Sequence, residues 1–151
     1  MSEGHTKKFT VERIFLKDLS FETPIGDAVF SMEWNPNHDI NLSLNSGNFS
    51  GDTWLVVLTA SITTRLGDKV AFLIEAQQAG HFTVAEHERE PLRRILRVDA
   101  PNILFPYLRE IIDNVTAKGG FPSVCMQVPD FEGWHEQDEA EHRAQNPQDG
   151  H

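Results

Sequence analysis

Residues 54–82 read WLVVLTASITTRLGDKVAFLIEAQQAGHF and carry the strongest fold signal in the chain. From Trp54 to Leu66 apolar and β-branched residues alternate with a period of two and first occupy both faces, which is typical of a central strand. Gly67-Asp68-Lys69 supplies a tight turn, and Val70 to Phe82 returns as another strand. Two such strands across a short glycine-containing loop predict an antiparallel hairpin.

Two further strands are expected before this hairpin. Phe9 to Glu22 alternates apolar and polar side chains, with one irregular stretch, and His38 to Ser46 carries isoleucine or leucine at every second position. The polar residues 46–52 predict a turn that leads into the hairpin. Together these segments predict a four-stranded antiparallel sheet.

The hydrophobic period changes to that of a helix after Ala85. Residues Glu86 to Leu96 are rich in Glu and Arg and predict a charged helix, followed by a break at Asp99-Ala100-Pro101-Asn102. Ile103 to Lys118 carries one broad apolar stripe and ends in Gly119-Gly120, which predicts a long helix with a left-handed glycine cap. The sequence therefore predicts an α+β fold, with the sheet packed against this long helix and shorter ones.

The two ends of the chain are poor in apolar side chains. We expect a flexible N-terminus over residues 1–8 and one folded domain over residues 9–134, closed by a short amphipathic turn from Phe131 to Trp134. Residues 135–151 are expected to form a disordered acidic tail, because they cannot bury enough apolar surface to offset the entropy of ordering.

The composition argues against several classes of partner. Thirteen Lys and Arg against 23 Asp and Glu give a formal net charge of −10, which opposes binding to nucleic acid or an anionic membrane. No apolar run approaches the roughly 18–20 residues that insert into a bilayer, and no secretory signal is recognisable at the N-terminus. Cys125 is the only cysteine, so no intrachain disulfide can form. These features predict a cytoplasmic protein.

The sequence offers no strong catalytic motif. The serine within Gly47–Gly51 lies in a polar turn and not in a strand-to-helix elbow, and Cys125 is better explained as a core or interface thiol. No glycine-rich phosphate loop is present. His135, Glu139 and His142 would share one face of a helix, which leaves a small metal enzyme as an alternative, but three ligands on an exposed tail make a weak site. We expect no catalytic residue, no metal and no cofactor.

Several blocks of sequence, spread from about Phe9 to Trp134, resemble those of the SecB family of protein-export chaperones and occur in the same order. PNILFPYLRE at 101–110 is similar to the signature of the family, and GGFP at 119–122 follows at the family's spacing. The remaining blocks are FLKDLSFE at 15–22, WNP at 34–36 and AFLIEAQQAG at 71–80. The resemblance implies an α+β subunit that assembles as a homotetramer, a dimer of dimers.

The resemblance also implies a function and its site residues. SecB chaperones hold precursor proteins unfolded without ATP and deliver them to the translocation motor SecA; a chaperone dedicated to one client, such as an antitoxin, is the alternative. The implied sets are Asp18, Glu22, Leu73 and Glu75 for SecA, Trp34, Phe72, Tyr107 and Phe131 for the client groove, and Ile74, Ala76 and Gln78 for subunit contacts.

Two segments depart from the family pattern. His135 stands where the family usually places an aromatic residue, one turn after Phe131, and Trp134 takes a usually aliphatic position. The segment Glu86–Val98 is unusually charged. Both departures concern the region in which the family builds its client groove.

Overall fold

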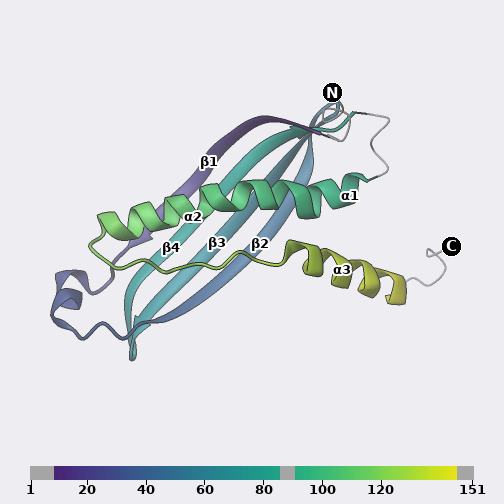
Figure 1. The fold of residues 1–151 in the computed structure, drawn as a ribbon. Coiled ribbons are helices and arrows are strands. Elements are labelled where there is room, and N and C mark those ends of the chain that lie inside the picture. Colours follow the sequence, from purple (N-terminus) through teal and green to yellow (C-terminus); the bar gives the residue numbers. More distant parts are fainter. Residues whose placement is uncertain (1–8, 86–90, 146–151) are drawn as a thin grey trace, which may run out of the picture.

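The computed structural model describes residues 9–85 and 91–145, and its helices lie on one face of a single sheet (Figure 1). The strands are β1 (Thr10–Glu22), β2 (Asn37–Ser50), β3 (Thr53–Leu66) and β4 (Lys69–Thr83). They pair antiparallel in the order β1-β4-β3-β2, which confirms the predicted α+β fold with its four-stranded antiparallel sheet. Within the described ranges, no helix has the length and hydropathy needed to cross a membrane.

The β3–β4 hairpin forms as predicted, and β2 is longer than predicted. Gly67 adopts a positive φ of 63° in the turn, a conformation that glycine tolerates best. β2 continues to Ser50 through the expected polar turn, where Ser46 pairs with Val56 and Gly47 with Leu55. The backbone of this polar run pairs with β3 while its side chains stay exposed, so an exposed edge strand looks like a loop in the sequence.

One helical stretch runs without a break from Leu92 to Lys118, through α1 (Leu92–Arg94), a π-helical segment (Ile95–Asp99) and α2 (Ala100–Lys118). The break expected at residues 99–102 is therefore wrong. Pro101 lacks a backbone N–H, and the wider π-helical turn directly before it accommodates this within a continuous helix. Residues 86–90, the first part of the expected charged helix, lie outside the described residues.

The predicted glycine cap closes α2. Gly120 has a φ of 89°, and the N–H of Phe121 donates to the carbonyl of Thr116 at 3.0 Å. This bond satisfies one of the carbonyls that a helix end leaves without a partner. A 3-10 helix (Gly26–Ser31) joins β1 to β2.

The core lies between α2 and the inner face of the sheet. Leu104, Leu108 and Ile112 of α2 are fully buried, as are Leu58 of β3 and Phe72 of β4. Among the residues that the structure describes, no helix lies on the opposite, outer face (Figure 1). The fold thus separates a face covered by helices from a face left open to solvent.

Gly80 is where α2 comes close to β4. A Cβ at this position would lie 2.9 Å from Phe82 Cε1, 3.1 Å from the Arg13 carbonyl oxygen and 3.2 Å from Leu104 Cδ2. We expect Gly80→Ala to lower the free energy of unfolding by about 1–3 kcal/mol, because the tightly packed neighbours must move. Gly47→Ala is the matched control, since no atom lies within 4 Å of its Cβ. Urea unfolding measures both; equal stability of the two variants would contradict the expectation.

The expected disorder of the tail is wrong for residues 135–145. An extended stretch crosses the helical face of the sheet and leads into α3 (Phe131–Gln145), so residues 135–145 are helical (Figure 1). Cys125 is exposed and is therefore not a core thiol. Its neighbours Val124 and Met126 are buried instead. Residues 1–8 and 146–151 lie outside the described residues, so the expectations for them stay predictions.

Candidate functional site

The four residues implied for SecA contact lie together on the outer face of the sheet. Glu22 of β1 pairs directly with Leu73 of β4, Ser20 with Glu75, and Asp18 with Gln77. Residues opposite each other in an antiparallel pair point to the same face, so the side chains of all four share it. We call Asp18, Glu22, Leu73 and Glu75 the carboxylate surface.

A shallow hollow marks the middle of the carboxylate surface. It has a volume of about 230 Å³, and Glu22, Leu73 and Glu75 contribute to its lining. Ser61 of β3 lies opposite Glu75 and donates a hydrogen bond of 3.0 Å from Oγ to Glu75 Oε2. This bond orients the carboxylate on the open face, where a partner could reach it.

Sequence reasoning missed one carboxylate on this face. Asp39 of β2 pairs with Thr63 of β3, which pairs with Leu73 of β4. The same cross-strand row therefore runs from Glu22 to Asp39 across the whole sheet. The alternation of β2 assigned Asp39 to the polar face, but only the register between strands shows which residues it lies beside.

Two of the four residues implied for the client groove lie together in an aromatic cluster. The ring of Trp34 stacks on Phe72 at 6.4 Å between centroids and lies 5.6 Å from Phe121. Phe72 itself is fully buried, whereas Phe30, which stacks on Phe121 at 5.4 Å, is 59% exposed. Trp34 and Phe30 therefore form the accessible edge of this cluster, and Phe72 supports it from the core.

The other two implied groove residues are placed differently. Tyr107 projects from α2 and is 50% exposed. Phe131 begins α3 and is buried against Trp134, with ring centroids 5.2 Å apart. A client could thus contact Tyr107 directly, but it could reach Phe131 only if α3 moved.

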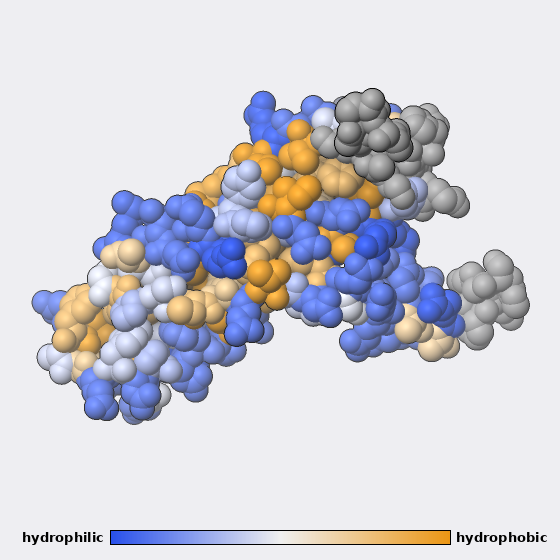
Figure 2. Space-filling model, viewed as in Figure 1, coloured by the Kyte–Doolittle hydropathy of each residue, from blue (hydrophilic) through white to orange (hydrophobic). Residues whose placement is uncertain are grey.

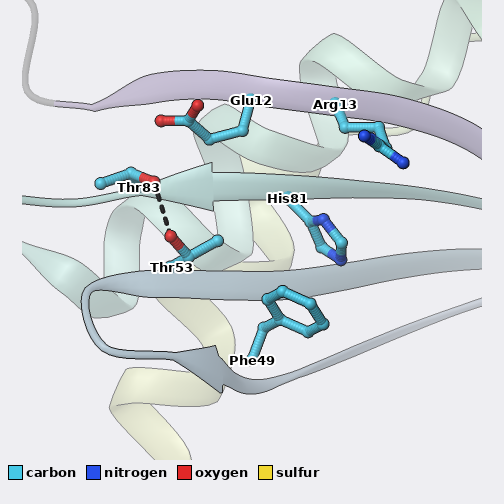
Figure 3. A pocket seen from close by; sticks show the side chains of 6 residues that line it. All are labelled: Glu12, Arg13, Phe49, Thr53, His81 and Thr83. Carbon is cyan, nitrogen blue, oxygen red and sulfur yellow. Dashed lines mark hydrogen bonds between the residues drawn. The ribbon is translucent and has the colours of Figure 1, made fainter.

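A second hollow of about 550 Å³ lies at the other end of the outer face (Figure 3). The ring of Phe49 stacks on His81 at 4.1 Å, and Phe15 meets the same imidazole edge-on at 5.2 Å. The hydroxyls of Thr53 and Thr83 share a hydrogen bond of 2.7 Å at its floor. The histidine is thus held between two phenyl rings, and packing explains its position.

The metal alternative gains no support from the geometry of α3. Glu139 accepts a hydrogen bond from Arg93, and the ring of His135 lies 3.8 Å from the same carboxylate. In residues 9–85 and 91–145, no group of three or more His, Cys, Asp and Glu side chains is arranged to hold a metal ion.

Known proteins are similar to this sequence over most of its length. The family model described as preprotein translocase subunit SecB matches residues 2–142. The chain belongs to the SecB family. The protein-export protein SecB of Hahella chejuensis is 46% identical over 82% of this chain and 78% of its own length, and that of Pseudomonas savastanoi is 39% identical over 91% and 85%.

A solved structure supports the SecB-like fold. The SecB-like chaperone of Mycobacterium tuberculosis, solved in complex with a peptide from the HigA1 antitoxin, matches with a TM-score of 0.64 and 12% identity. The match covers 81% of this chain and 91% of the mycobacterial one. At this identity the likeness concerns the fold. This chain is thus a SecB-family protein-export chaperone by sequence and SecB-like by architecture.

The residues implied for subunit contacts in this SecB-family chain are buried within the single chain. Ile74, Ala76 and Gln78 are 3%, 0% and 4% exposed in the single chain, because they lie on the inner face of β4 beneath α2. Gln78 Nε2 donates to the carbonyl of Phe15 at 3.0 Å and so joins two strands of one subunit. Their part in subunit contacts stays a prediction.

Proposed function

We propose that this SecB-family chain is an ATP-independent holdase of the cytoplasm that keeps precursor proteins unfolded and delivers them to SecA. It performs no catalysis and requires no cofactor. The observation that carries the proposal is the separation of two surfaces. One is the carboxylate surface on the open face of the sheet, and the other is formed by the exposed aromatic side chains Phe30 and Tyr107. A chaperone with separate surfaces can hold a client and contact its motor at the same time.

The carboxylate surface suits a basic partner. Asp18, Glu22 and Glu75 lie in adjacent strands, in a chain whose net charge is −10. Clustered charges of one sign steer an oppositely charged surface toward the correct orientation and raise the rate of association. Leu73 lies between the carboxylates of this surface and adds an apolar contact. SecA binding is therefore expected to weaken as the salt concentration rises.

The aromatic groups suit unfolded chains of many sequences. Burying about 800 Å² of apolar surface contributes roughly 20 kcal/mol, whereas ordering a client costs roughly 1–2 kcal/mol per residue. Ordering about ten to fifteen client residues therefore cancels most of the free energy gained by burial. Each groove should bind weakly, and several grooves on one assembly should hold one long client by raising its effective concentration.

The test of the holdase proposal is suppression of aggregation. An unfolded precursor diluted from denaturant should remain soluble and export-competent when this chain is present without nucleotide. Aggregation at the rate of the precursor alone would contradict the proposal. Co-purification from cells distinguishes a general chaperone from one dedicated to a single client: many precursors support the former, and one dominant partner supports the latter.

We further propose that the chain assembles as a homotetramer, a dimer of dimers, and that β1 contributes to a subunit contact. β1 is an edge strand with unpaired backbone groups, and Val11, Leu16 and Leu19 on its helix-facing side are 38%, 42% and 37% exposed. Figure 2 shows apolar side chains gathered between β1 and α2 on this side of the molecule. An exposed edge strand with an apolar row is a surface that proteins normally cover.

Charged substitutions in β1 should reduce the size of the assembly. We expect a native mass about four times 17.1 kDa for the unchanged chain. Leu16→Asp with Leu19→Asp should give a smaller species, because each carboxylate would be desolvated in the contact. Native mass spectrometry or light scattering measures the mass. Thr59→Asp with Ser43→Asp, on the outer face, is the control; a tetramer in the Leu16 and Leu19 variant would contradict the proposed role of β1.

A further inference from the structure

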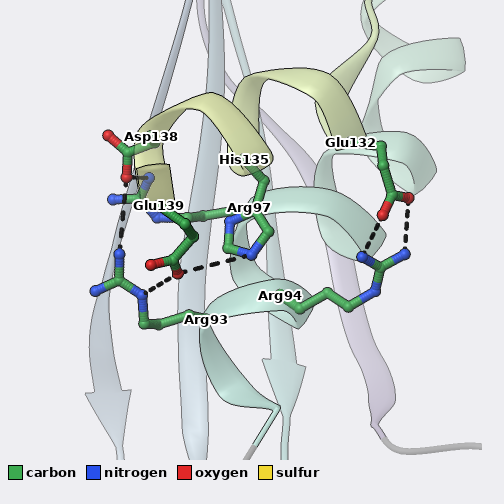
Figure 4. Close-up of polar contacts among 7 residues, drawn as sticks. All are labelled: Arg93, Arg94, Arg97, Glu132, His135, Asp138 and Glu139. Carbon is green, nitrogen blue, oxygen red and sulfur yellow. Dashed lines mark hydrogen bonds and ion pairs between the residues drawn. The ribbon is translucent and has the colours of Figure 1, made fainter. Parts of the chain in front are cut away.

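Three arginines beside α2 face the acidic side chains of α3 (Figure 4). We call this group the arginine latch; it consists of Arg93, Arg94 and Arg97 together with Glu132, Asp138 and Glu139. Arg94 binds the carboxylate of Glu132 through two nitrogens, with Nη2 2.7 Å from Oε1. These hydrogen bonds hold the pKa of Glu132 below its ordinary value. The two-bond geometry fixes the first turn of α3 against α1.

The other contacts of the latch hold the middle of α3. Arg93 Nε donates to Glu139 Oε2 at 2.9 Å, and Arg93 Nη2 lies 3.7 Å from Asp138 Oδ2. Arg97 of the π-helical segment binds the same carboxylate of Asp138. The contacts therefore span two turns of α3, from its first residues to Glu139.

Apolar packing contributes little to α3 beyond its first turn. Phe131 is buried, but Trp134 is 44% exposed, and the only apolar residues from 135 to 145 are Ala140 and Ala144. A helix of this composition does not form in isolation, because it is short and has no apolar face to bury. The arginine latch therefore supplies the attachment that apolar burial supplies elsewhere in the fold.

A cavity of about 410 Å³ lies under α3, between this helix, β2 and the π-helical segment. Its lining consists of Leu44, Asn45, Ser46, Leu96, Arg97, Trp134, His135 and Asp138. His135 Nδ1 is buried and has no hydrogen-bond partner in the described part of the chain. A buried polar atom without a partner is unfavourable. It therefore disfavours the position of α3 over this cavity, and that position depends on the latch.

We propose that the arginine latch holds α3 as an ionic strap over this cavity, and that its release admits an unfolded client segment. The inference rests on the proposed holdase function. Opening would expose Leu44, Leu96 and Phe131, apolar side chains that the strap now covers or borders. The described part of one segment that departs from the SecB pattern lies beside the other such segment, because Leu96 and Arg97 line the same cavity as Trp134 and His135.

Hydrogen exchange of α3 tests the latch without any client. Arg94→Glu should speed exchange of the amides of residues 131–145 by about three- to tenfold, since half-exposed ion pairs are individually weak and act here as a network. Arg94→Glu with Glu132→Arg should restore the wild-type rate by rebuilding the pair with its charges exchanged. Arg65→Glu, at an exposed position of β3 outside the latch, is the control and should leave the rate unchanged. The amides of α2 serve as the internal reference.

Salt and client binding complete the test. Raising NaCl from 0.05 to about 1 M should speed exchange in the wild type and have little effect in Arg94→Glu, because salt screens exposed pairs. The Kd for a reduced, alkylated, permanently unfolded protein should fall in Arg94→Glu by about the factor by which α3 opens. Unchanged exchange in Arg94→Glu, no recovery in the exchanged pair, or faster exchange with unchanged client affinity would each overturn the strap. A wild type that binds no unfolded protein contradicts the holdase function, and the exchange rates still report on the latch.

Discussion

Asp18→Lys combined with Glu75→Lys is expected to weaken SecA binding by at least about 100-fold and to leave client affinity within about twofold. The two side chains lie on the open face of neighbouring strands, one in β1 and one in β4. Reversing both charges removes attraction to a basic partner and adds repulsion, and a 100-fold loss corresponds to about 2.7 kcal/mol. The proposed client contacts lie elsewhere, so they should be unaffected.

Surface plasmon resonance with SecA and with an unfolded precursor measures the two affinities separately. Asp27→Lys with Glu141→Lys is the matched control, since it makes the same change in net charge at two exposed positions outside the carboxylate surface. If the control lost SecA binding equally, overall charge and not this surface would be responsible. SecA affinity that survives the Asp18 and Glu75 change would show that the implied contact is misplaced.

Phe72→Ala is expected to lower the free energy of unfolding by about 3–5 kcal/mol. Phe72 is fully buried on β4, and its ring meets Phe21 at 5.8 Å, Trp34 at 6.4 Å and Phe121 at 4.8 Å. Truncation would leave a cavity where four rings converge, and neighbouring rings can fill it only in part. Client affinity should change as well, because Trp34 at the accessible edge of the aromatic cluster loses the ring that supports it.

Tyr107→Ala separates stability from client contact. Tyr107 is half exposed on α2, so its truncation should change the free energy of unfolding by less than about 1 kcal/mol. Client affinity should nevertheless fall, because an exposed aromatic ring would be lost from a binding surface. Chemical denaturation and client titration of both variants check this contrast. A Phe72→Ala protein of wild-type stability would contradict the burial of that ring.

The helix over residues 135–145 could not be predicted from the sequence, and the cause is specific. Composition shows that residues 135–145 cannot bury apolar surface, and this holds in the structure. It does not show that Arg93, Arg94 and Arg97, some forty residues earlier, provide partners for Glu132, Asp138 and Glu139. Ion pairs between distant segments leave no periodic pattern in either segment, so the helix could not be predicted.

The sheet could be predicted because period-two alternation is a local property of each strand. Alternation also separates Leu73 and Glu75 from Ile74 and Ala76 on β4, in agreement with the register. It does not say which face a helix will cover. Only the structure shows that the residues of the carboxylate surface lie on the open face, whereas Ile74, Ala76 and Gln78 lie on the inner face beneath α2.

The strand order has a consequence for how the chain folds as it leaves the ribosome. β2, β3 and β4 follow one another through two-residue turns, so each can pair with its predecessor as soon as it is synthesised. β1 is made first, but among the described strands it pairs only with β4, from Thr10 against Thr83 to Glu22 against Leu73. Its backbone N–H and C=O groups therefore have no strand partner until β4 has been synthesised. The proposed holder of unfolded precursors is thus itself incompletely paired while it is being synthesised.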